Sequence, residues 1–294
     1  MKPVELLIIG AGDRGQTYDH YALAHPERAR VVGLAELRAH YREKLAQHHQ
    51  IAPENAFADW REAVERPKFA NAVIIATQDT QHRQPAIAFA HKGYDILLEK
   101  PMAPDVESCH SIVAAAQASQ VIFAVCHVLR YTPYTKKLKA LLDSGLIGDI
   151  VSIQHLEPVG YWHYAHSFTR GNWRNEAESS FMLLTKSCHD IDWLRYLVGQ
   201  RCLQVSSFGS LTQFRKEAKP AEAGEATRCL DCAYEERCAF LARRFYLKYF
   251  QEQQFHWPLD IITTNFTQEG ILEALRHGPY GRCVYECDND VVDH

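Results

Sequence analysis

A glutamate and a lysine follow a short, mostly apolar segment in the first half of the chain. Asp95–Leu98 has the length of a buried strand, and Glu99, Lys100 and Pro101 come directly after it. Ligands of parallel sheets bind beyond the carboxyl ends of the strands, so these residues are expected to line a cleft. A partly desolvated lysine can exchange a proton near neutral pH and can hydrogen-bond a substrate hydroxyl. The spacing therefore predicts acid–base or hydroxyl-binding chemistry at Lys100, with Pro101 restricting the backbone.

Three glycines follow the first apolar segment with the spacing of a dinucleotide-binding loop. Val4–Ile9 is followed by Gly10-Ala11-Gly12-Asp13-Arg14-Gly15, which opens a predicted helix. The first glycine permits a tight turn, the second lets the backbone approach a pyrophosphate, and the third lets helix and strand pack closely. The helix N-terminus favours phosphate charge. We expect the cofactor to be bound through Gly10, Gly12, Asp13, Arg14 and Gly15, and a glycine turn without a ligand is the alternative.

An acidic residue ends the second apolar segment. Glu36 lies about 20 residues beyond the glycine loop, where a carboxylate accepts hydrogen bonds from ribose hydroxyls. It would repel the 2′-phosphate of NADP, so the sequence favours NAD. Arg38 could hold that phosphate, which leaves NADP open as a second cofactor. The alternative role of Glu36 is a solvated strand end.

The first half of the chain alternates short apolar segments with helical patterns. Continuous apolar runs separated by helices indicate a parallel sheet covered on both faces, here a doubly wound Rossmann domain over residues 1–126. The predicted strands are Val4–Ile9, Val31–Ala35, Ala72–Ala76, Asp95–Leu98 and Val121–Val125. The predicted helices between them are Asp13–Ala24, Arg38–His49, Gln81–Lys92 and Asp105–Ser119.

Residues 127–294 are expected to form a second domain, which builds the substrate side of the site. Ile150–His155 alternates like a strand with one exposed face, and Leu203–Leu211 resembles another strand. Helices are predicted at Tyr134–Ser144 and Ser187–Leu197. The mixture of helices and strands indicates an α+β domain.

The segment around Gly160–Asn175 is rich in aromatic and polar residues. Aromatic faces with hydrogen-bonding tips suit a ring that bears several hydroxyls, and the charged groups could hold a carboxylate or a phosphate. A loop whose aromatic residues pack the domain junction is the alternative. The candidate substrate residues here are Glu157, His163, His166, Arg170, Asn172 and Trp173.

Nine cysteines are an odd number and a high count for a reducing compartment. Cys229, Cys232 and Cys238 are closely spaced, and Cys283 and Cys287 lie far down the chain. Three close thiols and one remote thiol suffice for a tetrahedral zinc site, and we predict a structural zinc on Cys229, Cys232, Cys238 and Cys287. Free thiols, a disulfide or an iron–sulfur cluster are the alternatives.

The composition argues against two classes of partner. The net charge is -4 and no run of lysines and arginines stands out, so we expect no binding to nucleic acid. No segment approaches the roughly 20 apolar residues of a membrane span, and the N-terminus lacks the pattern of a signal peptide. The expected location is the cytoplasm, and the expected partner is a small molecule.

Six short motifs, in this order and spacing, resemble the Gfo/Idh/MocA oxidoreductases, the family of glucose-fructose oxidoreductase and inositol dehydrogenase. They are the glycine loop, Ala76-Thr77 with His82, Glu99-Lys100-Pro101, Arg130-Tyr131, Ser144-Gly145-Leu146-Ile147-Gly148 and His189-Asp190-Ile191-Asp192. The resemblance covers nearly the whole chain. It implies a Rossmann domain followed by an open, mainly antiparallel sheet with helices that covers the nicotinamide, and substrates that are usually sugars or polyols.

The resemblance also implies roles for single residues. Lys100 matches the active-site lysine of the family and His189 its active-site histidine. Thr185 stands where better-known members often carry an aspartate, and Lys186 is next to it. The remaining implied contacts are Thr77, His82, Glu99 and Lys100 with the cofactor, and Arg130 and Tyr131 with the substrate.

We interpret His189 as the acceptor of the hydroxyl proton, Lys100 as the group that polarises that oxygen, and Lys186 as further positive charge. A helix-start histidine bonded to the backbone is the alternative for His189.

These observations predict an NAD-dependent dehydrogenase acting on a secondary alcohol of a sugar, polyol or sugar acid. Asn289–His294 resembles the entrance to a strand, so the C-terminal domain is expected to be shortened. Its sheet would be completed by another copy in a homo-oligomer, or the protein is a truncated member. One alternative function is elimination or hydrolysis of a glycosidic bond assisted by tightly held NAD. The other is a non-catalytic nucleotide-binding subunit.

Overall fold

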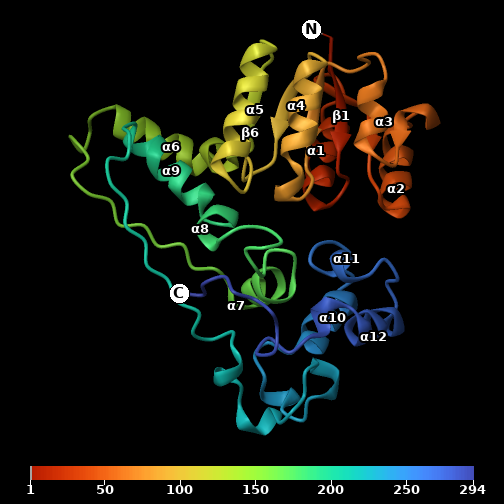
Figure 1. Cartoon of the computed structure of the whole chain (residues 1–294), viewed down its shortest axis with the longest axis vertical. Helices are drawn as coiled ribbons and strands as arrows, with labels where there is room; N and C mark the ends of the chain where they lie inside the picture. Colours follow the sequence, from red (N-terminus) through yellow and green to blue (C-terminus); the bar gives the residue numbers. More distant parts are fainter. Residues whose placement is uncertain (1) are drawn as a thin grey trace. The chain divides into compact units, whose positions relative to one another are not determined.

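The computed structural model describes residues 2–294 of the chain. Its internal contacts divide the chain into two compact units, which are described separately (Figure 1). Unit 1 comprises Met1–Ala140 with Ile191–Trp193, and unit 2 comprises Leu141–Asp190 with Leu194–His294. Unit 1 therefore extends beyond residue 126, where the sequence pattern places the end of the first domain.

Unit 1 is built on one six-stranded parallel sheet (Figure 1). The strand order is β3-β2-β1-β4-β5-β6, so the chain moves outward from β1 in one direction and then crosses to the other side of β1. In sheets of this type ligands bind where the order reverses, here beyond the carboxyl ends of β1 and β4. The doubly wound Rossmann sheet predicted from the sequence is thereby confirmed. The strands are β1 (Val4–Ile9), β2 (Ala29–Ala35), β3 (Ala56–Phe57), β4 (Ala72–Ile75), β5 (Asp95–Leu98) and β6 (Phe123–Val125).

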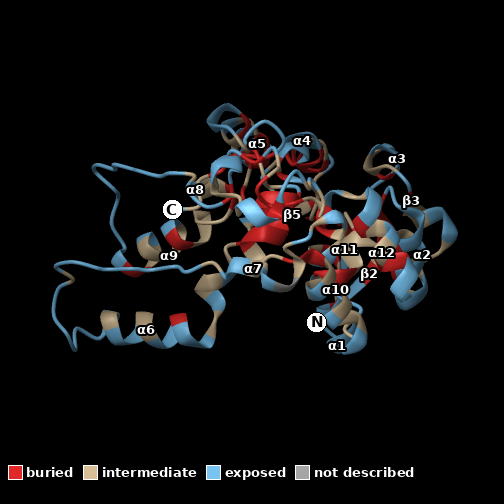
Figure 2. Cartoon of the chain, turned by 90° about the horizontal axis from the view of Figure 1, so that it is seen from below, coloured by how far each residue is buried: buried red, intermediate tan, exposed pale blue. Residues whose placement is uncertain are grey.

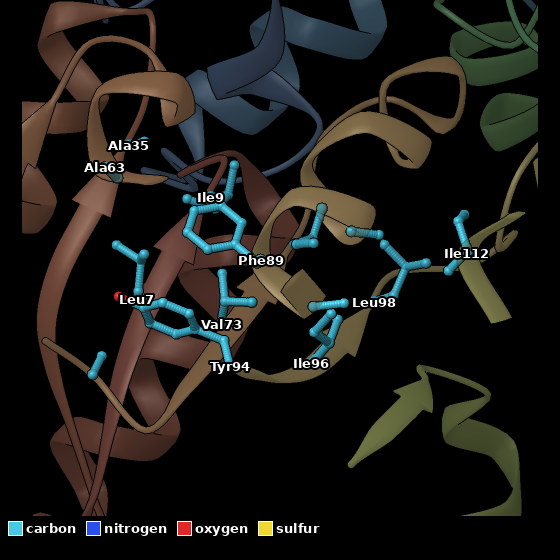
Figure 3. Close-up of a cluster of buried hydrophobic side chains, with 14 of the residues drawn as sticks. Leu7, Ile9, Ala35, Ala63, Val73, Phe89, Tyr94, Ile96, Leu98 and Ile112 are labelled. Atoms are coloured by element: carbon cyan, nitrogen blue, oxygen red, sulfur yellow. The ribbon is translucent and has the colours of Figure 1, made fainter. Parts of the chain in front are cut away.

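Alternate side chains of the strands enter two hydrophobic clusters. Along β1, Leu7 and Ile9 belong to one cluster and Ile8 to the other, because successive side chains of a strand point to opposite faces. Figure 3 shows the first cluster, in which Phe89 and Tyr94 are almost completely buried. Both faces of the sheet are covered, which explains why its strands are continuous apolar runs in the sequence.

The helices of unit 1 connect successive strands, and two of them, α3 and α5, begin at a side-chain cap. Asp59 forms a capping box with Glu62, and the Asp105 carboxylate accepts the backbone N–H of Ser108. The helices are α1 (Asp13–Ala24), α2 (Ala39–His49), α3 (Trp60–Glu65), α4 (Arg83–His91) and α5 (Val106–Ala118), and α6 (Pro133–Asp143) follows β6. Short 3-10 turns are η1 (Pro53–Asn55), η2 (Asp79–Gln81) and η3 (Val128–Tyr131).

Unit 2 consists of helices and irregular segments around two hydrophobic clusters, whose buried positions are red in Figure 2. Its α-helices are α7 (Tyr161–His163), α8 (Met182–Thr185), α9 (Cys188–Val198), α10 (Ala242–Gln251), α11 (Leu259–Ile262) and α12 (Gln268–His277). The π-helical η4 (Tyr164–Arg170) follows α7, and the 3-10 turns are η5 (Lys216–Ala218), η6 (Ala221–Ala223), η7 (Cys229–Asp231), η8 (Glu235–Arg237) and η9 (Pro279–Gly281). Throughout residues 2–294, no helix has both the length and the apolar character that crossing a bilayer demands.

The structure differs from the sequence prediction at two segments of unit 2. Ile150–His155 and Leu203–Leu211 were expected as strands, but neither forms regular secondary structure, and the sheet strands of residues 2–294 all lie in unit 1. Val151, Leu203 and Phe208 are each at least 95% exposed. Alternating apolar residues form a stable strand only when neighbouring strands satisfy the backbone and cover one face, and here neither condition is met. The predicted helices at 134–144 and 187–197 are confirmed as α6 and α9.

Candidate active site

The glycine loop lies at the carboxyl end of β1, where the strand order reverses. Gly10 has a φ of +90°, and a Cβ built there would lie 2.5 Å from the carbonyl oxygen of Ala76. A Cβ at Gly15 would lie 2.0 Å from the oxygen of Gly10. Glycine is therefore required at both positions for the loop to lie against β4 and for α1 to pack on the sheet. Gly12 is the N-cap of α1 and Asp13 its first residue, so backbone N–H groups suited to phosphate lie at this edge.

Glu36 lies against the glycine loop at the end of β2. One carboxylate oxygen accepts the backbone N–H of Ala11 at 2.8 Å, and the other accepts Nε–H of Arg38 at 2.8 Å. Burial by itself raises the pKa of Glu36, but the hydrogen bonds from Arg38 and Ala11 outweigh it and hold the pKa below its usual value. The Arg38 guanidinium lies 4.1 Å from the ring centroid of Tyr41. An ionised acceptor thus stands where the ribose is expected, and Arg38 would have to leave Glu36 to hold a 2′-phosphate.

An ion pair joins the glycine loop to the turn that carries Lys100. Nε–H of Arg14 donates to Oε1 of Glu99 at 2.8 Å, and the Tyr18 hydroxyl donates to the same oxygen at 2.7 Å. The backbone N–H of Lys100 donates to the second oxygen at 3.0 Å. Burial by itself raises the pKa of Glu99, but the charge of Arg14 and these hydrogen bonds outweigh it and lower the pKa. Glu99 is therefore an ionised link between two loops of the site.

The loop after β4 carries a buried hydroxyl group. Oγ1 of Thr77 has no hydrogen-bond partner among the described residues. His82 is fully buried between two carbonyl oxygens, with Nδ1 2.9 Å from that of Pro101 and Nε2 3.2 Å from that of Thr77. His82 thus ties this loop to the turn after Lys100. An unsatisfied buried hydroxyl is costly, so Thr77 fits a site where a nucleotide supplies the missing partner.

Replacing Thr77 with valine is expected to weaken nucleotide binding without weakening the fold. Valine has a similar shape and lacks only the hydroxyl. Loss of one hydrogen bond to the nucleotide should lower the affinity about 2- to 12-fold, while the Tm of the nucleotide-free protein should stay the same or rise. Calorimetric titration and thermal denaturation measure the two quantities. A lower Tm with unchanged affinity would show that the hydroxyl serves the fold.

Lys100 lies half-buried after β5, and its peptide bond to Pro101 is cis. Cys126 and His127, directly after β6, lie near the Glu99–Lys100 turn. Burial, and then the charge of Glu99, raises the pKa of Cys126 to about 12, so this thiol is protonated at neutral pH. Burial lowers the pKa of His127, and among the charges that act on it is Lys100. The sequence interpretation missed His127, although its position directly after a strand of the parallel sheet was a usable signal.

Arg130 is held by a carboxylate from α9. Its Nε–H donates to Oδ2 of Asp192 at 2.7 Å, and a second guanidinium nitrogen donates to Oδ1. The indole N–H of Trp193 donates to Oγ1 of Thr135 at 2.8 Å. These contacts join Ile191–Trp193 to the rest of unit 1. Arg130, which was predicted to contact substrate, therefore has its charge paired, and the neighbouring Tyr131 is 69% exposed.

The start of α9 in unit 2 carries a group of charged side chains around the half-buried His189. Nζ of Lys186 lies 2.9 Å from Oε1 of Glu157. His155 Nε2 lies 2.8 Å from Oδ1 of Asp190, whose Oδ2 is buried without a hydrogen-bond partner among the described residues. The charge predicted at Lys186 is therefore neutralised by Glu157 in this structure.

Thr185 occupies the position at which an aspartate is common in the family that the sequence resembles. The residue is 2% exposed, and its hydroxyl lies 2.6 Å from Oγ of Ser180 and 3.2 Å from Oγ of Ser179. This buried hydroxyl cluster offers no group that ionises near neutral pH. Thr185 therefore cannot take the acid–base role of an aspartate at this position.

Two residues predicted to bind substrate are instead part of the core of unit 2. His166 is 3% exposed, with Nδ1 2.6 Å from the Tyr246 hydroxyl and its ring stacked on Tyr280. Arg170 is also 3% exposed, and its Nε–H donates to the carbonyl oxygen of Arg282 at 2.7 Å. Polar character did not mark these two residues as a binding surface, because polar groups can be buried when they are hydrogen-bonded.

The other aromatic and polar residues predicted to bind substrate differ in how far they are buried. Asn172 is exposed. His163 is half-buried, with its ring edge-on to Trp257 at 5.2 Å, and Trp173 is half-buried with its ring 6.5 Å from that of Phe168. Both side chains therefore pack against aromatic rings within unit 2.

The buried His166 predicts that unit 2 is sensitive to acid. Burial, with the charges of His163 and Arg170, lowers the pKa of His166 from 6.5 to about 3. The unfolded chain takes up this proton below about pH 6.5, whereas the folded chain takes it up only near pH 3. The stabilisation is therefore complete above about pH 6.5 and falls by up to about 1.4 kcal/mol for each pH unit below it.

Urea unfolding at about pH 7.5 and about pH 5 measures this effect. His166→Gln retains a hydrogen-bonding side chain that does not titrate, so its free energy of unfolding should fall less over this range than that of the wild type. Equal losses in the two proteins would contradict the assignment.

The cysteines are brought together differently from the prediction. Cys229, Cys232 and Cys238 line one small cavity, but the fourth thiol that lines it is Cys283. Cys287 does not line the cavity, and its Sγ–H donates to the carbonyl oxygen of Cys283 at 3.2 Å. Spacing alone could not choose between two cysteines four residues apart.

Two family models match the chain. One, described as an oxidoreductase family with an NAD-binding Rossmann fold, matches residues 4–127. The other, the GFO/IDH/MocA C-terminal domain, matches residues 135–231. The first match contains the glycine loop, Glu36 and Lys100, and the second contains His189.

Individual proteins agree with these models. The 2,7-anhydro-N-acetylneuraminate hydratase of Mediterraneibacter gnavus is 26% identical over 208 residues, covering 68% of this chain and 50% of the relative. The scyllo-inositol 2-dehydrogenase (NAD(+)) of Bacillus subtilis is 27% identical over 214 residues, covering 64% and 59%. The chain spans about half the length of these curated relatives.

A solved structure shares the fold. Levoglucosan dehydrogenase, in complex with NADH and levoglucosan, matches with a TM-score of 0.54 and 26% identity, over 68% of this chain and 55% of that chain. Its likeness, the two family models and the strand order of unit 1 all lead to the same assignment. The chain belongs to the Gfo/Idh/MocA family of oxidoreductases.

Proposed function

We propose that this chain is an NAD-dependent dehydrogenase that oxidises a secondary alcohol of a sugar, polyol or sugar acid. The observation that carries the proposal is the sheet edge of unit 1, where the glycine loop contacts Glu36 and is joined through Arg14 and Glu99 to the Lys100 turn. Relatives named for scyllo-inositol and levoglucosan support this substrate class.

The side chains of unit 1 suit NAD better than NADP. A carboxylate offers about four acceptor positions, so Glu36 can accept ribose hydroxyls while it keeps the N–H of Ala11. A 2′-phosphate would meet this negative charge. Gly12 leaves room for a pyrophosphate at the start of α1, and Thr77 has an unsatisfied hydroxyl to offer.

The proposed chemistry assigns one role to each polar side chain. NAD supplies the hydride acceptor when it is bound. The Lys100 ammonium donates a hydrogen bond to the substrate hydroxyl oxygen and polarises it. For unit 2, we assign to His189 the role of proton acceptor, which suits an imidazole at neutral pH. Lys186 would contribute positive charge only after its pair with Glu157 opens.

Thermal denaturation with NAD, NADH, NADP and NADPH tests the cofactor. A ligand that binds only the folded state at a concentration of about 100 Kd stabilises it by about 2.7 kcal/mol. We expect a rise in Tm with NAD or NADH, a smaller rise with NADP, and a smaller NAD effect in Glu36→Ala. No rise with any nucleotide, in protein whose absorbance shows no nucleotide carried through purification, would contradict the proposal.

Measuring NADH formation during turnover distinguishes a dehydrogenase from an enzyme whose overall reaction is redox-neutral. With added NAD, the absorbance of NADH should increase in the presence of a suitable polyol, sugar or sugar acid. The second candidate is elimination, hydration or hydrolysis with tightly held NAD, and the relative named as a hydratase supports it. It predicts product formation without NADH accumulation. Nucleotide binding without either reaction across these substrate classes would indicate a non-catalytic subunit.

A further inference from the structure

Four cysteines from two distant segments of unit 2 surround one small cavity. Cys229, Cys232 and Cys238 come from the segment around η7 and η8, and Cys283 comes from the end of the chain. An antiparallel bridge between Arg228 and Arg282 places the neighbours of two of these cysteines opposite each other. The backbone N–H of Cys283 also donates to the carbonyl oxygen of Thr227 at 2.8 Å. These backbone contacts therefore hold Cys283 beside the three cysteines of the η7–η8 segment.

The size of the cavity limits what it can hold. Its volume is about 20 Å³, and about 10–15 Å³ is enough for one water molecule. A single ion fits such a space. A cluster of several iron and sulfide ions would require the surrounding side chains to move apart.

A buried positive charge lies beside these thiols. Nη2 of Arg170 donates to Sγ of Cys229 at 3.3 Å and to the carbonyl oxygen of Phe240 at 2.8 Å. Arg170 also lines the cavity, and no carboxylate of the described residues forms an ion pair with it. Burying an unpaired cation is unfavourable. Four thiolates around one divalent ion carry a net charge of −2, which a guanidinium at this position would partly compensate.

We propose that Cys229, Cys232, Cys238 and Cys283 bind one zinc ion, which fastens the η7–η8 segment to the end of the chain. Thiolate ligands select soft or borderline cations, and four cysteine ligands without an open position are typical of structural zinc. Each thiol loses its proton to water on binding, so one Zn²⁺ replaces four protons.

Binding requires a small inward movement of the sulfur atoms. Zn–S bonds of about 2.3 Å place tetrahedral ligands about 3.8 Å apart. In the described residues, no three thiol sulfurs lie within 4.8 Å of one another. Rotation of the cysteine side chains into the cavity can close this difference because the cavity lies among all four.

Metal analysis of the full chain tests the proposal. The protein is expressed with zinc, purified without chelators and analysed by inductively coupled plasma mass spectrometry. We expect close to one zinc per wild-type chain, and little zinc in Cys229→Ser and Cys283→Ser. Cys287→Ser is the matched control, since this half-buried thiol lies outside the cavity, and it should retain zinc. His155→Ala should also retain it, which separates this site from the His155, Glu157 and Asp190 group.

Cobalt substitution of the wild type provides a measurement that does not depend on the folding of a variant. Cobalt(II) bound by four thiolates should give intense sulfur-to-metal charge-transfer absorption, and titration with zinc should remove it. Thermal denaturation should show a lower Tm after metal removal.

Several results would overturn the proposal. One is a zinc-free wild type whose thiols all react freely and which shows no cobalt charge-transfer band. Another is zinc that is lost in Cys287→Ser but kept in Cys283→Ser. A disulfide among the four cysteines, or iron with acid-labile sulfide, would also contradict it. None of these measurements depends on nucleotide binding, so the zinc site and the dehydrogenase can fail independently.

Discussion

Replacing Lys100 with alanine is expected to lower kcat by about 100- to 1,000-fold, the usual cost of removing one positioned hydrogen-bond donor from the reacting oxygen. The side chain is half-buried at the carboxyl end of β5 and is not a member of either hydrophobic cluster of unit 1. Its removal should therefore change the free energy of unfolding by about 1 kcal/mol or less. NADH absorbance measures the rate, and thermal denaturation measures the fold.

Lys137→Ala is the matched control, because Lys137 is an exposed lysine of unit 1 on α6. It should leave both rate and Tm unchanged. The kinetic constants of Lys100→Ala separate two roles for this lysine. A fall in kcat indicates an interaction made in the transition state, whereas a rise in KM at constant kcat would indicate binding alone. Full activity in the variant would refute the assignment of Lys100.

Gly10→Ala is expected to cost about 2–5 kcal/mol of stability and to abolish nucleotide binding. The added methyl would lie 2.5 Å from the carbonyl oxygen of Ala76, and the backbone φ of +90° is unfavourable for alanine. The glycine loop and the segment that begins at Ala76, directly after β4, would both have to move. Urea unfolding and calorimetric titration with NADH measure the two losses.

Gly12→Ala separates the requirements of the fold from those of the ligand. A Cβ at Gly12 would meet only the end of the Arg38 side chain, at 3.4 Å, which is an ordinary van der Waals contact. Stability should therefore be nearly unchanged, while nucleotide binding should fall sharply, because the methyl occupies space needed by the pyrophosphate. Normal binding by Gly12→Ala would argue against the phosphate site at this loop, and normal stability of Gly10→Ala would contradict the observed steric conflict.

An ion pair and a backbone hydrogen bond link the glycine loop to Lys100 in unit 1. Arg14 belongs to the glycine loop, and its partner Glu99 directly precedes Lys100. Glu99 also accepts the backbone N–H of Lys100. A change in Arg14 should therefore disturb the position of Lys100 as well as the binding of phosphate. Sequence analysis predicted both residues as cofactor contacts, but their mutual ion pair appeared only in the fold.

Cys283 is a second case in which the sequence could not predict a contact. Close spacing correctly grouped Cys229, Cys232 and Cys238, but the choice of Cys287 over Cys283 had no local basis. The bridge between Arg228 and Arg282 brings Cys283 to the cavity. His166 is a similar case, because its polar character indicated a binding loop, whereas its hydrogen bond with Tyr246 permits burial.

By itself the sequence determined the Rossmann sheet of unit 1, the glycine loop and the family of the chain. These features depend on apolar periodicity and on glycine spacing, which act over a few neighbouring residues. The tertiary structure decided which polar groups meet, such as Glu36 with the backbone N–H of Ala11 and Arg14 with Glu99. It also decided that 150–155 and 203–211 form no strand. Pairing and burial depend on contacts between distant segments, and no local pattern specifies those contacts.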